Sequence, residues 1–141
     1  MRNVRVLLVE DNRINQIVAQ HILKRDGVTV VTKDNGREAI EELTMNRYDL
    51  VLMDVQMPQL DGIEASRIIR DETSSVLDHA VPIVAMTAYT GQEDRARFRD
   101  AGMTRYVAKP LDAEELQKLI DDVSHGLTTE NTTQNRPGDG V

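Results

Sequence analysis

The sequence predicts a doubly wound α/β domain, on three observations. Strand-like and helix-like patterns alternate five times along the chain, as expected for parallel strands joined by helices. Four of the strand-like runs (VRVLLV, DLVLM, PIVAM and RYVA) are short and rich in apolar residues, which is typical of strands buried on both faces of a parallel sheet. A length of 141 residues with 40% hydrophobic residues fits one ordinary domain with a core and some tail.

The first strand is expected at residues 4–9, and a helix follows at residues 13–25 with Gly27 as its stop. The helix carries a broad apolar stripe, made of Ile14, Ile17, Val18, His21 and Ile22. We expect the second strand at residues 28–32. Asn35 and Gly36 then open a second helix, whose core positions are Ala39, Ile40 and Leu43.

The second half of the chain continues the alternation. The third strand is expected at residues 50–53 and the third helix at 63–70. A long polar connection leads to Pro82, which admits the fourth strand. The helix expected at residues 90–101 is charged and only weakly amphipathic, so it should be the least firmly packed element.

The fifth strand is expected at residues 105–108. A capping box of Asp112 and Glu115 then begins the last helix. We therefore expect a domain at residues 1–125 and a disordered tail or linker at 126–141, which contains only one large apolar residue before its terminal valine.

Composition excludes several classes of function. The net charge of −7 argues against direct binding to nucleic acid or to an anionic membrane. The absence of cysteine removes disulfides, thiolate zinc sites and cysteine nucleophiles, and it fits a cytoplasmic location. No membrane span and no signal peptide are visible, so we expect no membrane contact for this segment.

Polar residues stand where four of the strands stop. Glu10 and Asp11 follow the first strand, Asp54 the third, Thr87 the fourth and Lys109 the fifth. Ligands of open α/β sheets bind beyond the carboxyl ends of the strands. With a strand order of 2-1-3-4-5, the three carboxylates fall together at the switch point of the sheet.

This residue set suits Mg²⁺ and a phosphoryl group. Carboxylate oxygens are the ligands Mg²⁺ prefers, and Mn²⁺ can take its place. Lys109 and Thr87 can contact phosphoryl oxygens. Taken singly, each residue is more often a turn, a cap or a surface charge, so the inference depends on their joint placement. His21, His79 and His125 are scattered and receive no role, and the arginines at 95–105 alternate with acids as on a solvated face.

The chain resembles the receiver domain of two-component response regulators over residues 4–124. Four motifs carry the resemblance: VEDN at 9–12, MDVQMPQLDG at 53–62, TA at 87–88 and YVAKP at 106–110. The resemblance implies a flavodoxin-like (βα)5 fold with sheet order 2-1-3-4-5. It also implies that Pro58 and Gly62 shape the loop after Asp54 and that a cis peptide precedes Pro110.

The resemblance further implies roles for the site residues. Asp54 is the expected phosphoacceptor, and Lys109 and Thr87 are expected to contact the phosphoryl group. Glu10, Asp11, Asp54 and the backbone carbonyl of Gln56 are the expected metal ligands. Tyr106 is the expected aromatic switch, and Gln56 and Tyr89 are expected to tune dephosphorylation, by orienting water or by shielding the acyl phosphate.

The motifs EDNRINQIVA and QMP resemble most closely the receivers of hybrid sensor histidine kinases. The implied partners are a histidine kinase, a histidine phosphotransfer domain, or both. Ile14, Ile17 and Val18 either form a docking surface for that partner or belong wholly to the core. The sequence alone leaves both hypotheses open.

Three other functions compete with this interpretation. A phosphatase of the haloacid dehalogenase type would need an aspartate at position 56, where this chain has glutamine. A nucleotide or flavin binder would need a phosphate-binding loop after the first strand, where this chain has EDNRIN. An interaction module that is never phosphorylated leaves the carboxylates unexplained. We therefore expect a signalling switch that catalyses its own phosphorylation and does not turn over external substrates.

Overall fold

The computed structural model describes residues 4–25, 27–57 and 60–125. Five strands and five helices alternate strictly along this part of the chain. The strands are β1 (Arg5–Val9), β2 (Thr29–Lys33), β3 (Leu50–Asp54), β4 (Ile83–Thr87) and β5 (Arg105–Ala108). The helices are α1 (Arg13–Arg25), α2 (Gly36–Met45), α3 (Gly62–Arg70), α4 (Gln92–Asp100) and α5 (Ala113–Ser124).

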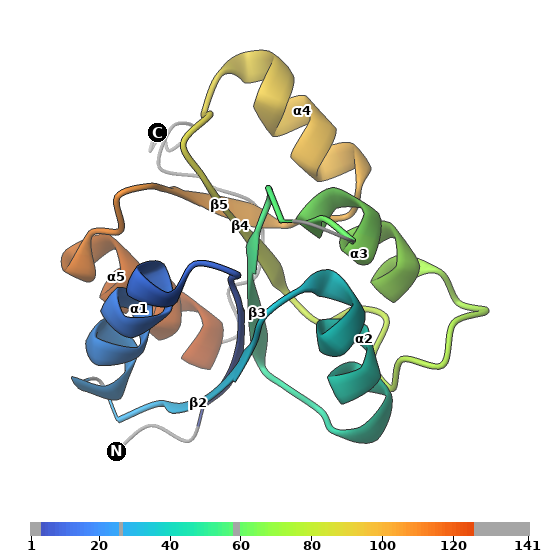
Figure 1. Ribbon diagram of the computed structural model, residues 1–141, viewed down its shortest axis with the longest axis horizontal. Helices are drawn as coiled ribbons and strands as arrows, with labels where there is room; N and C mark the ends of the chain where they lie inside the picture. Colours follow the sequence, from blue (N-terminus) through green and yellow to red (C-terminus); the bar gives the residue numbers. More distant parts are fainter. Residues whose placement is uncertain (1–3, 26, 58–59, 126–141) are drawn as a thin grey trace.

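The sheet is parallel throughout, and its order is β2-β1-β3-β4-β5, so the expected topology is confirmed. Helices α1 and α5 cover one face, while α2, α3 and α4 lie on the other (Figure 1). Alternate residues of each strand supply the two cores. In β1, for example, Leu7 and Val9 face the α2 side, whereas Val6 and Leu8 face the α1 side.

The register of the strands determines where the site residues lie along the strand direction. Val9 pairs with Met53, so Glu10, which follows β1, lies level with Asp54, the last residue of the neighbouring β3. Thr87 pairs with Ala108, so Lys109 follows one residue beyond. Four separate segments thus deliver polar side chains to one rim of the sheet.

Element boundaries differ from the sequence predictions by one or two residues. The second strand lies one residue later than expected, because its ladder with β1 pairs Thr29 to Arg5 and Lys33 to Val9. The third helix begins at Gly62, with Asp61 as its N-cap. The fourth helix begins at Gln92, because the chain is extended at its N-cap Gly91.

Two glycines have a clear structural reason. Gly27, the predicted stop of α1, has a φ of 76°, which favours glycine. A Cβ on Gly62 would overlap the carbonyl oxygen of Asp54 and lie 2.9 Å from the Cγ of Met53. The expected tight start of α3 is confirmed. The expectations for Pro58 and for the tail at 126–141 concern residues outside the described part of the chain.

The face of α1 that packs on the sheet differs from the predicted stripe. Its buried residues are Gln16, Ala19, Ile22 and Leu23. Ile14, Ile17 and Val18 are 70%, 52% and 41% exposed, and His21 is exposed as well. The hypothesis that the whole stripe belongs to the core is therefore wrong. The buried face of α1 includes a polar residue, Gln16, and an apolar pattern in the sequence cannot identify such a position.

Two further expectations, one about α4 and one about Pro110, are confirmed. Phe98 is the only buried side chain of α4, so the expected weak packing of this helix is confirmed. The peptide bond before Pro110 is cis. No helix in residues 4–25, 27–57 or 60–125 combines the length and the apolar character that crossing a membrane requires.

Candidate functional site

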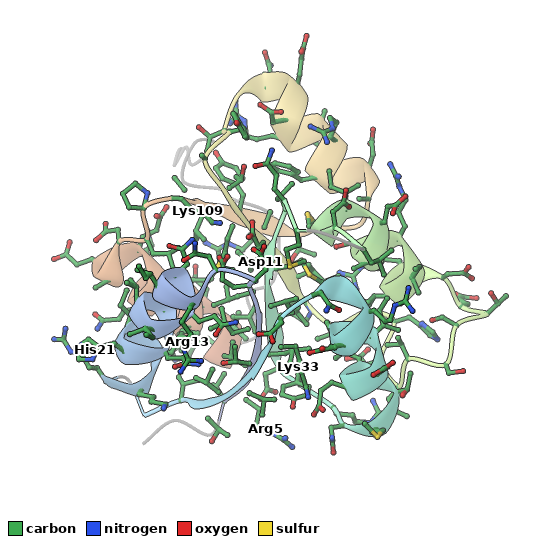
Figure 2. The ribbon with its side chains drawn as sticks, viewed as in Figure 1. Arg5, Asp11, Arg13, His21, Lys33 and Lys109 are labelled. Carbon is green, nitrogen blue, oxygen red and sulfur yellow. The ribbon has the colours of Figure 1, made fainter. Side chains whose placement is uncertain are left out.

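An acidic cluster lies at the carboxyl end of the sheet. Glu10, Asp11 and Asp54 each place one carboxylate oxygen within 4.8 Å of the others. Glu10 and Asp54 are buried, with 1% and 4% of their surface exposed, whereas Asp11 is exposed. Figure 2 shows Asp11 and Lys109 near the centre of the molecule and His21 at its outer surface. The sequence therefore located the three carboxylates correctly.

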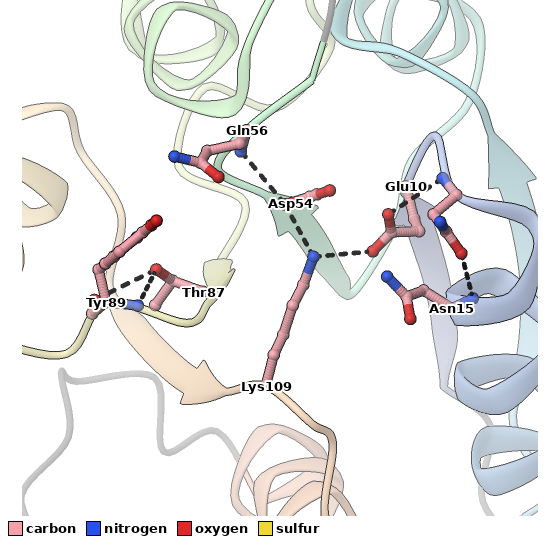
Figure 3. Close-up of polar contacts among 8 residues, drawn as sticks. Glu10, Asn15, Asp54, Gln56, Thr87, Tyr89 and Lys109 are labelled. Atoms are coloured by element: carbon pink, nitrogen blue, oxygen red, sulfur yellow. Dashed lines mark hydrogen bonds and ion pairs between the residues drawn. The ribbon is translucent and has the colours of Figure 1, made fainter.

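Lys109 joins two of these carboxylates. Its Nζ lies 3.1 Å from Asp54 Oδ1 and 3.3 Å from Glu10 Oε1 (Figure 3). Backbone groups complete the contacts: Gln56 N–H donates to Asp54 Oδ1 at 3.2 Å, and Asn12 N–H donates to Glu10 Oε2 at 3.1 Å. One ammonium thus faces a cluster of three carboxylates, which leaves an excess of negative charge.

The electrostatics reflect this excess. Burial raises the pKa of Glu10 to about 7, and the neighbouring Asp54 adds to the rise. Burial lowers the pKa of Lys109, but the hydrogen bond and charge of Asp54, together with the charge of Glu10, outweigh this effect and raise it overall. Lys109 therefore stays protonated, and Glu10 binds a proton near neutral pH, because its carboxyl is buried and lies beside Asp54.

Thr87 lies at the same rim, but its hydroxyl is engaged locally. Thr87 Oγ1 accepts a hydrogen bond from Tyr89 N–H at 2.8 Å and donates one to Tyr89 O at 3.2 Å (Figure 3). Thr87 is buried, whereas the side chain of Tyr89 is 56% exposed. Tyr106 is partly buried against the α2-side core, and the Arg95 guanidinium lies 5.9 Å from the centre of its ring.

Two residues of the site escaped the sequence prediction. Gln16 is 4% exposed, and its Nε2 donates to the carbonyl oxygen of Glu10 and to Asp34 Oδ1. A signal for Gln16 was present, since it lies at helical spacing from Ala19 and Leu23 on the buried face of α1. No local pattern marked Asp34, because its contact with Gln16 spans two elements.

A cavity of about 110 Å³ opens beside the site, between α1 and the segment after β5. It is lined by Glu10, Asn15, Val18, Lys109, Pro110 and Leu111. The lining thus includes Glu10 and Lys109 of the site together with the exposed Val18 of α1. The three histidines lie elsewhere: His79 contacts Ile69 O, His125 contacts Asp121 O, and neither these nor His21 belongs to the acidic cluster.

The fold and the site define a class: a doubly wound α/β domain with an acidic, lysine-paired site at its switch point. The sequence profile of the response regulator receiver domain matches residues 6–121. The chain belongs to this family, and it is a receiver domain of two-component phosphorelay signalling.

Similar proteins include large sensor kinases. The chain is 41% identical over 124 residues to the autoinducer 2 sensor kinase/phosphatase LuxQ of Vibrio cholerae, covering 88% of this chain and 14% of that protein. It is 35% identical over 119 residues to the sensor protein GacS of Pseudomonas syringae, covering 84% of this chain and 13% of that protein. The chain therefore corresponds to a small part of these relatives.

Solved structures agree in fold. The receiver domain of a sensor histidine kinase from Pseudomonas aeruginosa, with a magnesium ion in its active site cleft, has a TM-score of 0.78 at 38% identity, covering 87% of this chain and 98% of that one. This chain also matches the co-crystal structure of the yeast histidine phosphotransfer protein Ypd1 with the receiver domain of Ssk1. The TM-score is 0.78 at 29% identity, and the match covers 90% of this chain and 92% of the matched chain.

Proposed function

We propose that this domain accepts a phosphoryl group from a phosphohistidine on the carboxylate of Asp54. The observation that carries the proposal is the buried Asp54 carboxylate, 3.1 Å from Lys109 Nζ and within one acidic cluster with Glu10 and Asp11. A buried aspartate with an ammonium beside it is well placed to act as a nucleophile on a charged phosphoryl group.

The donor set fits Mg²⁺, with Mn²⁺ as a substitute. Three carboxylates within 4.8 Å of one another offer hard oxygen ligands, and we assign the backbone carbonyl of Gln56 as a fourth. When bound, the ion supplies positive charge that offsets the carboxylates and the incoming phosphoryl oxygens. A carboxyl group must be deprotonated to bind a metal ion. Because the pKa of Glu10 is raised to about 7, Mg²⁺ binding near neutral pH has to displace a proton from it.

The chain's own residues then perform the transfer. Asp54 Oδ forms the new P–O bond as the P–N bond of the donor histidine breaks and the imidazole leaves. Lys109 moves its ammonium from the carboxylates to a phosphoryl oxygen. Thr87 exchanges its hydrogen bonds with Tyr89 for one to the phosphoryl group, and Tyr106 turns toward the space that Thr87 leaves.

The lifetime of the acyl phosphate depends, in this proposal, on Gln56 and Tyr89. These side chains flank the site from the loops after β3 and β4 (Figure 3). The amide of Gln56 can orient an attacking water, whereas the exposed ring of Tyr89 can cover the acyl phosphate. The domain is thus a self-phosphorylating switch, with no turnover of external substrates.

We infer that the donor or acceptor docks on α1. Ile14, Ile17 and Val18 are exposed apolar side chains of α1, and Val18 lines the cavity that Glu10 and Lys109 also line. The inferred partner is a histidine kinase or a histidine phosphotransfer domain, as in the similar yeast complex. The similarity to sensor kinases and to a hybrid signal transduction histidine kinase supports an origin within a hybrid histidine kinase. We also propose a cytoplasmic location for this domain.

Incubation with acetyl phosphate and Mg²⁺, followed by intact mass measurement, tests the proposed function. We expect one added phosphoryl group in the wild type, and none in Asp54→Asn or after chelation of the metal. Modification that persists in Asp54→Asn would contradict the assignment of the acceptor.

A further inference from the structure

We propose that Gln16 is a positioning residue that holds Glu10 in place for Mg²⁺ and that Asp34 acts through it. This inference rests on the proposed function, because it concerns the same metal site. Gln16 itself lies in α1, outside the group of carboxylates, and nothing in the proposed transfer uses it directly.

The contacts of Gln16 are specific. Its side chain is buried within the first two turns of α1. Nε2 donates to the carbonyl oxygen of Glu10 at 2.6 Å and to Asp34 Oδ1 at 2.8 Å. Both hydrogens of the amide are therefore used, and the amide connects β1, α1 and the loop after β2 at one point.

These contacts fix the direction of the Glu10 side chain. Glu10 N–H donates to Lys33 O at 3.1 Å, and Glu10 O accepts from Gln16. The backbone of Glu10 is thus held on both sides of its Cα, so that its carboxylate points to Lys109 and Asp54. Partners of this indirect kind typically change metal affinity by about 10–100-fold when they are removed.

A purely structural role is the competing explanation, and the chain offers a matched control for it. Gln20 lies one turn later in α1, and its Nε2 donates to Thr32 Oγ1 at 2.7 Å. Both glutamines tie α1 to the β2 side of the domain, but only Gln16 contacts Glu10. A substitution of Gln20 therefore removes a similar hydrogen bond without touching the metal site.

The test is calorimetric titration of the folded proteins with MgCl₂ at pH 8, with thermal melting recorded without metal. We expect Gln16→Met to bind Mg²⁺ about tenfold more weakly than the wild type and Gln20→Met to stay within about twofold. Wild-type affinity in folded Gln16→Met would overturn the inference. No Mg²⁺ binding by the wild type would instead overturn the proposed function.

Asp34 provides a second variant in case Gln16→Met fails to fold, since Asp34 is exposed. We expect Asp34→Ala to weaken Mg²⁺ binding by about threefold, because Gln16 loses the partner that orients it. When Gln16→Met folds, the same change made in that background should have no further effect. An unchanged affinity in the single variant, or an equal loss in both backgrounds, would show that Asp34 does not act through Gln16.

Discussion

At the scale of single residues, the site depends on a balance of charge. Within residues 4–25, 27–57 and 60–125, Lys109 is the one ammonium in contact with Glu10 and Asp54, and Asp11 lies in the same cluster. Burial of Glu10 makes this balance sensitive to pH, because the pKa of its carboxyl is raised to about 7. Near neutral pH, the negative charge of Glu10 can thus be removed either by a bound cation or by a proton.

Mg²⁺ binding should therefore weaken in acid. Glu10 is mostly deprotonated at pH 8 and mostly protonated at pH 6, given its pKa of about 7. A site that requires the deprotonated form loses about tenfold in affinity between these two pH values. Calorimetric titrations with MgCl₂ at pH 6 and pH 8 measure the ratio directly. Equal affinities would show that Glu10 does not titrate in this range or does not take part in the site.

The metal-free domain should lose stability as pH rises from 4.5 to 7. Folded Glu10 holds its proton up to about pH 7, whereas the unfolded chain releases it near 4.5, so the folded state binds more protons in this window. The shift corresponds to about 3 kcal/mol in the free energy of unfolding. Asp54→Asn should reduce this dependence in part, since burial of Glu10 remains, and stabilise the domain at pH 8 by about 1 kcal/mol, because one repelling charge is gone.

Urea unfolding in chelator measures both effects, and Asp49→Asn is the control. Asp49 immediately precedes β3, whereas Asp54 ends it, and Asp49 Oδ2 accepts a hydrogen bond from Arg5 N–H at 2.8 Å. Its substitution should give no gain. A loss of stability in Asp54→Asn at pH 8 would mean that the ion pair with Lys109 outweighs the repulsion within the cluster.

At the scale of elements, α1 divides its two sides between the core and solvent. Ala19, Ile22 and Leu23 pack on the sheet, whereas Ile14 and Ile17 remain exposed. Exposed branched apolar side chains add little to the stability of a domain, but they suit a helix-on-helix contact with a partner. The helix can thus be changed on its outer side without loss of the fold.

The double substitution Ile14→Ser and Ile17→Ser should separate partner docking from chemistry. We expect the free energy of unfolding to change by less than about 0.5 kcal/mol for these exposed positions. Transfer from a phosphorylated histidine phosphotransfer protein should slow about tenfold, while modification by acetyl phosphate stays unchanged. Met45→Ser on α2, an equally exposed apolar position at 66%, serves as the control. Equal slowing by Met45→Ser would argue against α1 as the docking surface.

The start of α3 should tolerate no side chain at Gly62. A Cβ there meets the carbonyl oxygen of Asp54, whereas one at Gly91 lies 3.4 Å from Asp94 Oδ2. Gly62→Ala should therefore cost about 1–3 kcal/mol through overpacking, and Gly91→Ala should change stability by less than about 0.5 kcal/mol. Denaturant unfolding of the two variants measures both free-energy changes. An unchanged free energy of unfolding in Gly62→Ala would contradict the described packing.

At the scale of the whole molecule, the sequence predicted most of what local patterns encode. Short apolar runs marked the strands, and the polar residues after them marked the rim, because parallel strands end on one side of a sheet. The α/β order and the cluster of Glu10, Asp11 and Asp54 followed from this. The roles of these residues in phosphoryl transfer remain predictions.

What escaped the sequence depends on contacts between distant segments. The buried side of α1 was misjudged, because Gln16 is polar yet satisfied inside the domain by Glu10 and Asp34. The engagement of the Thr87 hydroxyl with Tyr89 was also not predictable, since a strand-end hydroxyl has several partners within reach. Apolar periodicity carries no information about such polar contacts.

If Asp54 is the phosphoacceptor, the modified domain carries an acyl phosphate on this side chain, and chemical trapping can locate it. Borohydride reduces an aspartyl phosphate to homoserine, which peptide mass spectrometry can locate after modification with acetyl phosphate and Mg²⁺. We predict homoserine at position 54 and at no other aspartate. Homoserine at position 11, or none in protein that has gained a phosphoryl group, would contradict Asp54 as the phosphoacceptor.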